Sequence, residues 1–303
     1  MALQEINFSV RDGLRLRVRC HPAPGSSRRP LICLASIIGN ARDFDPLGMA
    51  LSGHGTSRRS VYALDARGHG SSEWDPVWSN YTELQDCEDA LDLLTLLGLT
   101  GAAILGSGRG GIVAMIMGLL RPSALGAVVL NDIGPSIEPD GYVRMMSQVG
   151  RLPTPSTWAD ATQLMRRLYA DRYPRLTTGE WQDLARAAFL EKDGRPAPGY
   201  DPAISRTHSL SRGTAEVPSL WAPFLALSHV PVLCLRGELS DVLSSQTVAR
   251  MADQHPALAS ATIPREGHAP RLRDTASIDL IASFLEQTDA MTGQSPRTLK
   301  AVA

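Results

Sequence analysis

The stretch from Ile104 to Gly111 reads Ile-Leu-Gly-Ser-Gly-Arg-Gly-Gly and decides how the rest of the chain is interpreted. Apolar runs on both sides, Ala102 to Leu105 and Ile112 to Leu120, predict a short buried strand and a helix. A tight glycine turn between a strand and a helix is the pattern G-x-S-x-G, which presents a nucleophilic serine. Glycines fill both flanking positions of that pattern, and Gly108 stands where the serine would be.

Length, composition and charge are those of an ordinary globular chain. The 303 residues are 43% hydrophobic and 20% charged, and the formal net charge is -1. This balance provides no field that would attract nucleic acid or an anionic membrane. No apolar run approaches the roughly 20 residues that span a bilayer, and the four cysteines show no CxxC pair, which favours reduced thiols. We therefore expect a cytoplasmic protein that acts on a small molecule and binds neither nucleic acid nor membrane, as a monomer or a homodimer.

Strands and helices alternate over most of the chain. Near the N-terminus, Glu5 to Val10 and Leu14 to Cys20 alternate around Arg11-Asp12-Gly13, which is typical of a hairpin. Further strands are expected at Leu31 to Leu34, Val61 to Leu64, Ala127 to Leu130, Val230 to Leu235 and Ala261 to Pro264, and helices at Phe44 to Leu51, Leu84 to Leu97, Val248 to Met251 and Ile278 to Leu285. This alternation predicts an α/β fold with a parallel sheet covered by helices on both faces.

The alternation stops between about Pro135 and Pro223, where helical patterns such as Ala159 to Ala170 and Pro/Gly-rich breaks predict a helical insertion. We assign residues 1–134 and 224–290 to the core, 135–223 to the insertion and 291–303 to a frayed tail. Apolar side chains of the insertion are candidate substrate contacts, although residues of this kind more often pack inside such an insertion; they are Met145, Met146, Trp158 and Trp181.

Two loops late in the chain carry an acid and a histidine. Asp241 follows the strand that ends at Arg236, and His268 follows the next expected strand. Because the carboxyl ends of parallel strands meet at one edge of a sheet, both side chains are expected beside the glycine turn. We expect Asp241 to hold His268 in the tautomer that a general base requires. Asp132, just past an earlier strand, is the rival acid.

The backbone around the glycine turn is expected to stabilise an oxyanion. One N–H donor would come from Arg109, at the start of the helix, and the other from Ile37, in the loop after the strand at Leu31. Ser36 and Ser107 border these donors and are candidate substrate contacts. Ser107 is disfavoured as a replacement nucleophile, because the residues two positions away on each side are not glycines.

Two other glycine-containing stretches have simpler interpretations. The turn from Asp65 to Ser72 reads Asp-Ala-Arg-Gly-His-Gly-Ser-Ser, and we interpret it as structural, with Asp65 and Arg67 organising loops by hydrogen bonds. The glycines of 106–111 also match G-x-G-x-x-G by spacing. They lie on the fifth expected strand rather than the first, and the acidic residue that should follow is slightly too far away, so nucleotide binding is disfavoured.

These stretches together resemble the α/β-hydrolase fold family over nearly the whole chain, from Glu5 to Leu285. The resemblance implies a mostly parallel eight-stranded sheet with helices on both faces and a helical cap formed by the insertion. It also implies hydrolysis of an ester, lactone, amide or C–C bond in a small, largely apolar substrate, with attack from position 108 and His268 as base, and without cofactor or metal. The chain departs from the family pattern at two positions. Gly108 replaces the nucleophilic serine, and Ser36 stands where the family usually has glycine.

Glycine at position 108 has three explanations. The first is a deliberate Ser→Gly substitution made to trap a ligand, and the otherwise complete triad favours it. Alternatively, the protein is a natural enzyme in which His268 and its acid activate water or a substrate proton directly, in the room that the glycine leaves. The third explanation is a binding or sensor protein that kept the pocket and lost catalysis.

Overall fold

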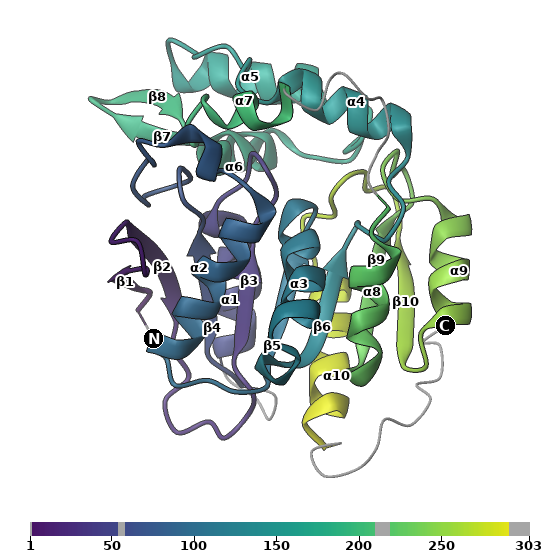
Figure 1. Cartoon of the computed structure of the whole chain (residues 1–303). Coiled ribbons are helices and arrows are strands. Elements are labelled where there is room, and N and C mark those ends of the chain that lie inside the picture. Colours follow the sequence, from purple (N-terminus) through teal and green to yellow (C-terminus); the bar gives the residue numbers. More distant parts are fainter. Residues whose placement is uncertain (1, 54–57, 210–218, 291–303) are drawn as a thin grey trace.

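An eight-stranded sheet forms the centre of the computed structural model, which describes residues 2–53, 58–209 and 219–290 (Figure 1). The strand order is β1-β2-β4-β3-β5-β6-β9-β10. The strands are β1 (Gln4–Ser9), β2 (Arg15–His21), β3 (Leu31–Leu34), β4 (Val61–Asp65), β5 (Ala102–Ser107), β6 (Leu125–Asn131), β9 (Val232–Gly237) and β10 (Leu258–Ile263). Only the β1–β2 and β2–β4 pairs of this sheet are antiparallel. The mostly parallel eight-stranded sheet is therefore confirmed.

Helices cover both faces of the sheet, as predicted (Figure 1). Neighbouring residues of one strand point to opposite faces. Ile32 accordingly belongs to the apolar cluster that includes residues of α2, α3, α8 and α9, whereas Leu31 belongs to the cluster that includes residues of α1 and α10. The bounds of these helices are α1 (Asp45–Ser52), α2 (Glu83–Leu96), α3 (Arg109–Leu120), α8 (Trp221–Leu225), α9 (Ser245–Gln254) and α10 (Thr275–Ala290). Short 3-10 helices lie at Ala41–Phe44, Trp78–Asn80, Pro122–Ala124 and Ala226–His229.

The chain between β6 and β9 lies over the carboxyl ends of the strands (Figure 1). Its elements are α4 (Pro139–Gln148), α5 (Trp158–Tyr169), α6 (Thr178–Ala188), β7 (Phe189–Lys192), β8 (Arg195–Pro198) and α7 (Ile204–Ser209). The β7–β8 hairpin differs from the purely helical expectation. Asp193 and Gly194 both adopt positive φ, of 51° and 74°, which is the conformation that a two-residue hairpin turn requires.

Helix α8 packs with the core although it begins inside the expected insertion. Phe224 is fully buried in the same apolar cluster as Val113 of α3, and Trp221 packs against that cluster. The expected boundary at residue 223 therefore falls within a helix that the core holds. The expected tail, 291–303, lies outside the described residues.

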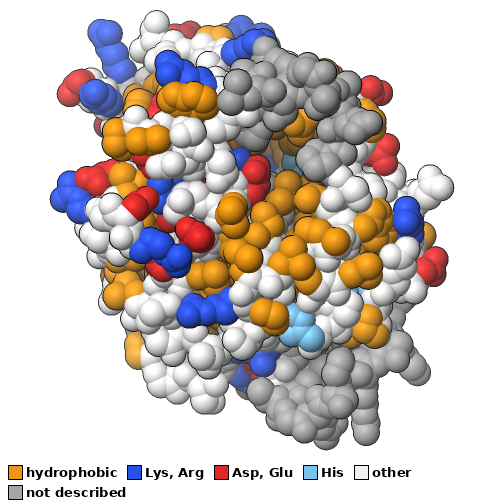
Figure 2. All heavy atoms as spheres, in the orientation of Figure 1, with side chains coloured by type: hydrophobic (Ala, Val, Ile, Leu, Met, Phe, Trp, Pro, Cys, Tyr) orange, Lys and Arg blue, Asp and Glu red, His pale blue; other side chains and the backbone are white. Residues whose placement is uncertain are grey.

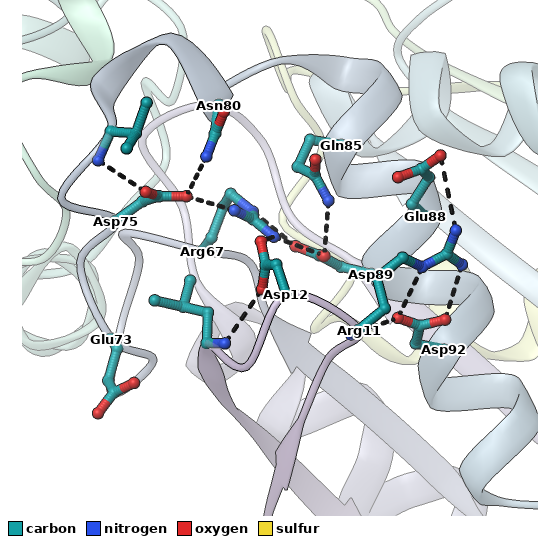
Figure 3. Close-up of polar contacts among 12 residues, drawn as sticks. Arg11, Asp12, Arg67, Glu73, Asp75, Asn80, Gln85, Glu88, Asp89 and Asp92 are labelled. Atoms are coloured by element: carbon teal, nitrogen blue, oxygen red, sulfur yellow. Dashed lines mark hydrogen bonds and ion pairs between the residues drawn. The ribbon is translucent and has the colours of Figure 1, made fainter.

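The turn after β4 organises three loops, as its sequence predicted. Arg67 is fully buried and contacts three carboxylates, those of Asp89, Asp12 and Asp75 (Figure 3). Burial alone would lower the pKa of Arg67, but its bonds to Asp89 and Asp12 outweigh burial and raise the pKa above the ordinary value. Asp65 accepts backbone N–H bonds from Ala41 and Ser71, at 2.8 and 2.9 Å. The interpretation of this turn as structural agrees with these contacts.

The outer surface of α3 is apolar, in keeping with a helix whose sequence is apolar all round. Leu119 and Leu120 of α3 and Leu225 of α8 are each about half exposed or slightly less, and hydrophobic side chains gather over these helices in the middle of Figure 2. No helix among the described residues combines the length and apolarity needed to cross a bilayer. All four cysteines are buried and unpaired.

Candidate active site

Gly108 forms the turn between β5 and α3. Its φ of 50° and ψ of -116° lie in a region that residues with a side chain rarely adopt. The neighbouring glycines are required by close approach, since a Cβ on Gly106 would lie 2.3 Å from the carbonyl oxygen of Gly110. A Cβ on Gly110 would in turn lie 2.2 Å from the carbonyl oxygen of Leu34. The predicted strand, sharp turn and helix are therefore present.

His268 faces the space above Gly108. A Cβ on residue 108 would lie 3.3 Å from Nε2 of His268 and 3.4 Å from Cβ of Ser36. The imidazole is nearly buried, with 7% of its surface exposed. A side chain or a small molecule in this space would therefore meet the Nε2 atom directly.

The acid that contacts His268 is Asp132, not Asp241. Nδ1 of His268 lies 2.9 Å from Oδ2 of Asp132. Because an ionised carboxylate only accepts hydrogen bonds, Nδ1 carries the proton and donates it, which leaves Nε2 as the basic nitrogen. The expectation that Asp241 orients His268 was wrong, and the rival acid takes its place.

Asp132 is held rigidly at the end of β6. The residue is fully buried with a φ of 57°, and its Oδ1 accepts the backbone N–H of Gly237 at 2.7 Å. The Ser240 hydroxyl donates to Oδ2 at 2.6 Å. Strands β6 and β9 are neighbours. The last residue of β9 and the loop after it therefore supply these donors, while the carboxylate directly follows β6.

Asp241 is engaged elsewhere. Nη2 of Arg144 donates to its Oδ1 at 2.7 Å, and Nε of the same guanidinium donates to Oδ2. Burial would raise the pKa of Asp241, but Arg144 outweighs it and holds the pKa below its ordinary value. Arg172 lies 3.9 Å from the same carboxylate. Asp241 thus links the insertion to the core through α4.

A cavity of about 690 Å³ lies between the sheet edge and the insertion. Many of the residues expected from sequence line it, namely Ser36, Ile37, Ser107, Gly108, Arg109, Met145, Met146 and His268. Trp158 does not line this cavity, so the expectation that it contacts substrate there was wrong. Its ring instead packs under the guanidinium of Arg186, at 4.6 Å, beside a separate hollow of the insertion. Trp181 is buried in the core of the insertion.

The two expected oxyanion donors lie in anchored backbone. The carbonyl oxygen of Ile37 lies 2.9 Å from Nε2 of His69, whose Nδ1 is 2.9 Å from the carbonyl oxygen of Arg67. Arg109 begins α3, and its guanidinium donates to Asp86 at 2.8 Å. His69 therefore acts on the backbone of this loop rather than on the space above Gly108.

The walls of the cavity differ in chemistry. One part is apolar and is formed by Ile112, Ile116, Ile133, Ile137 and Met145. Guanidinium groups of Arg42 and Arg271 line another part, and among the described residues neither makes a salt bridge. Burial lowers the pKa of Arg271 below its ordinary value. The cavity can accommodate a substrate that combines apolar groups with an anionic one.

Sequence reasoning missed several polar residues of this site. Burial raises the pKa of Asp43 to about 6, although the Asn40 N–H bond opposes the rise. The spacing of Asn40 and Asp43, which form a capping box, was a readable signal for a helix start. Asn131 donates to the Ser107 hydroxyl at 3.0 Å. Tyr173 donates to the carbonyl oxygen of Ala269 at 2.9 Å, next to His268.

No group of three or more His, Cys, Asp or Glu side chains in the described part of the chain is arranged to hold a metal ion. The polar residues that line the cavity include His268, Ser36, Ser107, several arginines, and the carboxylates Asp43, Asp45, Glu83 and Asp183.

Several known proteins resemble this chain in sequence and in structure. A model described as "Alpha/beta hydrolase family" matches residues 24–279. A 3-hydroxybutyrate-oligomer hydrolase of Cupriavidus necator is 29% identical over 266 residues, which are 84% of this chain and 88% of that protein. A 2-(acetamidomethylene)succinate hydrolase of Mesorhizobium japonicum is 24% identical over 77% of this chain and 78% of that protein. The crystal structure of an alpha/beta hydrolase from Novosphingobium aromaticivorans is 34% identical, covers 95% of this chain and 99% of that one, and has a TM-score of 0.87.

Proposed function

Because this chain belongs to the alpha/beta hydrolase family, we propose that it hydrolyses an ester bond in a small substrate that carries a carboxylate. The observation that carries the proposal is the position of His268. Its Nδ1 is fixed by Asp132 at 2.9 Å, and its Nε2 would lie 3.3 Å from a Cβ on residue 108. A basic nitrogen is thus aimed at the point from which an acyl group is attacked.

The substrate class follows from the cavity walls and from the relatives. Apolar residues such as Ile112 and Ile133 suit short carbon chains, and Arg42 and Arg271 suit a carboxylate. The two named relatives act on a 3-hydroxybutyrate oligomer and on a succinate derivative. Both names describe substrates with carboxylates. An oligomer of a hydroxy acid joined by ester bonds fits both kinds of wall.

With glycine at position 108, a water molecule is the nucleophile of the proposed reaction. A water molecule in the space above Gly108 gives one proton to Nε2 of His268 while its oxygen attacks the ester carbonyl carbon. The carbonyl electrons move to its oxygen, which the N–H groups of Ile37 and Arg109 stabilise. The C–O bond then breaks, the leaving alkoxide takes the proton from the imidazolium, and an acid and an alcohol leave. Asp132 stabilises the imidazolium between these steps.

Gly108 makes this a slow hydrolase and fits a site whose side-chain nucleophile has been removed. Water must be bound and oriented at each turnover, whereas a serine at this position would already be covalently positioned. Gly108→Ser would place a hydroxyl between the backbone and Nε2 of His268, with a shift of a few tenths of an ångström in its neighbours. The slow rate leaves ligands in the cavity for longer, which suits a substrate trap.

The test compares the unmodified chain with Gly108→Ser and Gly108→Ala on a 3-hydroxybutyrate dimer and on p-nitrophenyl butyrate. We expect slow hydrolysis by the unmodified chain and a gain of about 10²-fold or more with Gly108→Ser, because triad members act as a unit. The alanine variant lacks a hydroxyl and should show no gain. A binding protein would hold the dimer in calorimetry and hydrolyse neither substrate in any of the three forms.

A further inference from the structure

The space above Gly108 is bordered by a second polar side chain besides His268. Cβ of Ser36 lies 3.4 Å from the point at which a Cβ of residue 108 would stand, and Nε2 of His268 lies 3.3 Å from the same point. We propose that Ser36 holds the attacking water against His268, and so takes part in catalysis directly. This inference rests on the proposed hydrolytic function.

The Ser36 hydroxyl is available for this role. Ser36 lines the cavity, and within the described residues its hydroxyl makes no hydrogen bond to protein. Its oxygen would lie 3.0 Å from a Cβ on Gly39, so the glycine there keeps room for it. Rotation about one staggered bond moves the hydroxyl around a Cβ that already borders the gap.

The backbone on both sides of Ser36 is fixed. The carbonyl oxygen of Ala35 accepts the N–H of Gly110 at 3.1 Å, which ties the loop to the first turn of α3. The carbonyl oxygen of Ile37 contacts His69 at 2.9 Å. The backbone carbonyl oxygen of Ser36 also accepts the N–H of Gly39, at 3.0 Å. A water held by this residue would therefore be held at a constant position relative to Gly108 and His268.

Two hydrogen bonds are what a nucleophilic water requires. One hydrogen points to Nε2 of His268 and leaves as the proton that the base accepts. The other hydrogen points to Oγ of Ser36, which accepts the hydrogen bond. A lone pair of the water oxygen then faces the ester carbonyl carbon. With His268 alone, the water would rotate about a single bond, and the productive orientation would be rarer.

The test measures kcat and KM separately for Ser36→Ala, Ser36→Thr and the unmodified chain, with p-nitrophenyl butyrate. We expect Ser36→Ala to lower kcat by about 10- to 100-fold, the range for losing one strong hydrogen bond, with KM changed by less than about twofold. Ser36→Thr keeps the hydroxyl and should recover most of kcat. Thermal unfolding of each variant verifies that the fold is intact.

The same cycle in the Gly108→Ser background separates water-holding from general packing. A hydroxyl at position 108 makes the first attack itself. Ser36→Ala should therefore cost less in the acylation step of that variant, measured as the pre-steady-state burst of p-nitrophenolate, than in turnover by the unmodified chain. An equal loss in both backgrounds would assign Ser36 a packing role and overturn the inference.

Three further outcomes distinguish this inference from the proposed function. If His268→Ala abolishes turnover while Ser36→Ala leaves kcat unchanged, the hydrolytic site stands and the role of Ser36 is refuted. If a fluorophosphonate forms a covalent adduct mapped to Ser36 by mass spectrometry, Ser36 is itself the nucleophile and does not hold water. If neither substitution changes the rate, the proposed function is refuted as well.

Discussion

Oδ2 of Asp132 accepts the Nδ1 proton of His268 over 2.9 Å, across 136 positions of sequence. Both side chains are almost inaccessible to solvent, at 0% and 7% exposed. A carboxylate in this position fixes the imidazole tautomer and stabilises its charged form when Nε2 takes a proton. The neighbouring Asp241 is committed to Arg144 and provides a natural comparison.

Asp132→Asn is expected to lower kcat by about 10²-fold or more, because an amide favours the wrong tautomer of His268. Asp241→Asn, a substitution of the same chemistry in the adjacent loop, should lower kcat by less than about threefold, since Asp241 contacts Arg144. Steady-state kinetics at one pH gives both values. A larger loss from Asp241→Asn than from Asp132→Asn would reverse this assignment.

Any side chain at position 108 should cost stability. Residue 108 has a φ of 50° and a ψ of -116°, and holding a non-glycine residue in such a region costs about 1 to 3 kcal/mol. Gly108→Ala and Gly108→Ser are therefore expected to lower the free energy of unfolding by similar amounts, measured in urea. Alanine and serine forms as stable as the glycine form would show that the turn relaxes.

The fold could be predicted from the sequence because two of its glycines stand where no side chain fits. Gly106 and Gly110 lie where any Cβ would collide with backbone, so their spacing identifies the turn between β5 and α3. The position of His268 near Gly108 could also be predicted, because loops that follow parallel strands all lie at the same edge of the sheet.

The choice of acid could not be made in the same way. Asp132 and Asp241 follow β6 and β9, which are neighbours with Asn131 beside Leu235. Strand order therefore brings both carboxylates to one edge, and only side-chain contacts separate them. Asp241 is hydrogen-bonded to Arg144 instead. Arg144 belongs to the insertion, whose packing the sequence pattern does not specify. The β7–β8 hairpin was missed although Asp193-Gly194 is a turn signal.

Asp43 should make substrate binding depend on pH. Burial raises the pKa of Asp43 to about 6, so the carboxyl is neutral below that pH and negative above it. A negative charge in the cavity repels a substrate carboxylate, and KM for the 3-hydroxybutyrate dimer should rise by about tenfold between pH 5 and pH 7.5. Asp43→Asn should abolish the rise. Neutral p-nitrophenyl butyrate is the control, because its KM should change little in either form.

The Asp43 carboxyl should also make the free energy of unfolding depend on pH. The folded state binds the Asp43 proton more tightly than the unfolded chain, whose pKa is about 4. The stabilisation is therefore full below about pH 4 and is lost as pH rises through about 6. The free energy of unfolding at pH 4 minus that at pH 7 should therefore be smaller in Asp43→Asn than in the unmodified chain. A difference that is equal in both would contradict the raised pKa.

Arg67 is expected to be essential to the fold. Arg67→Ala leaves the buried carboxylates of Asp89 and Asp75 without their cation (Figure 3), and removing one partner of a buried ion pair costs about 3 to 5 kcal/mol. Arg15 is the matched control, because its ion pair with Glu73 is exposed to solvent. Arg15→Ala should shift the midpoint of urea unfolding only slightly. Equal shifts would show that the Arg67 cluster is not structural.

The most direct measurement is the rate at which the unmodified chain hydrolyses a 3-hydroxybutyrate dimer, compared with the rate of His268→Ala under the same conditions. We predict measurable hydrolysis that falls by about 10²-fold or more when the imidazole is removed. Equal rates for the two proteins would contradict it.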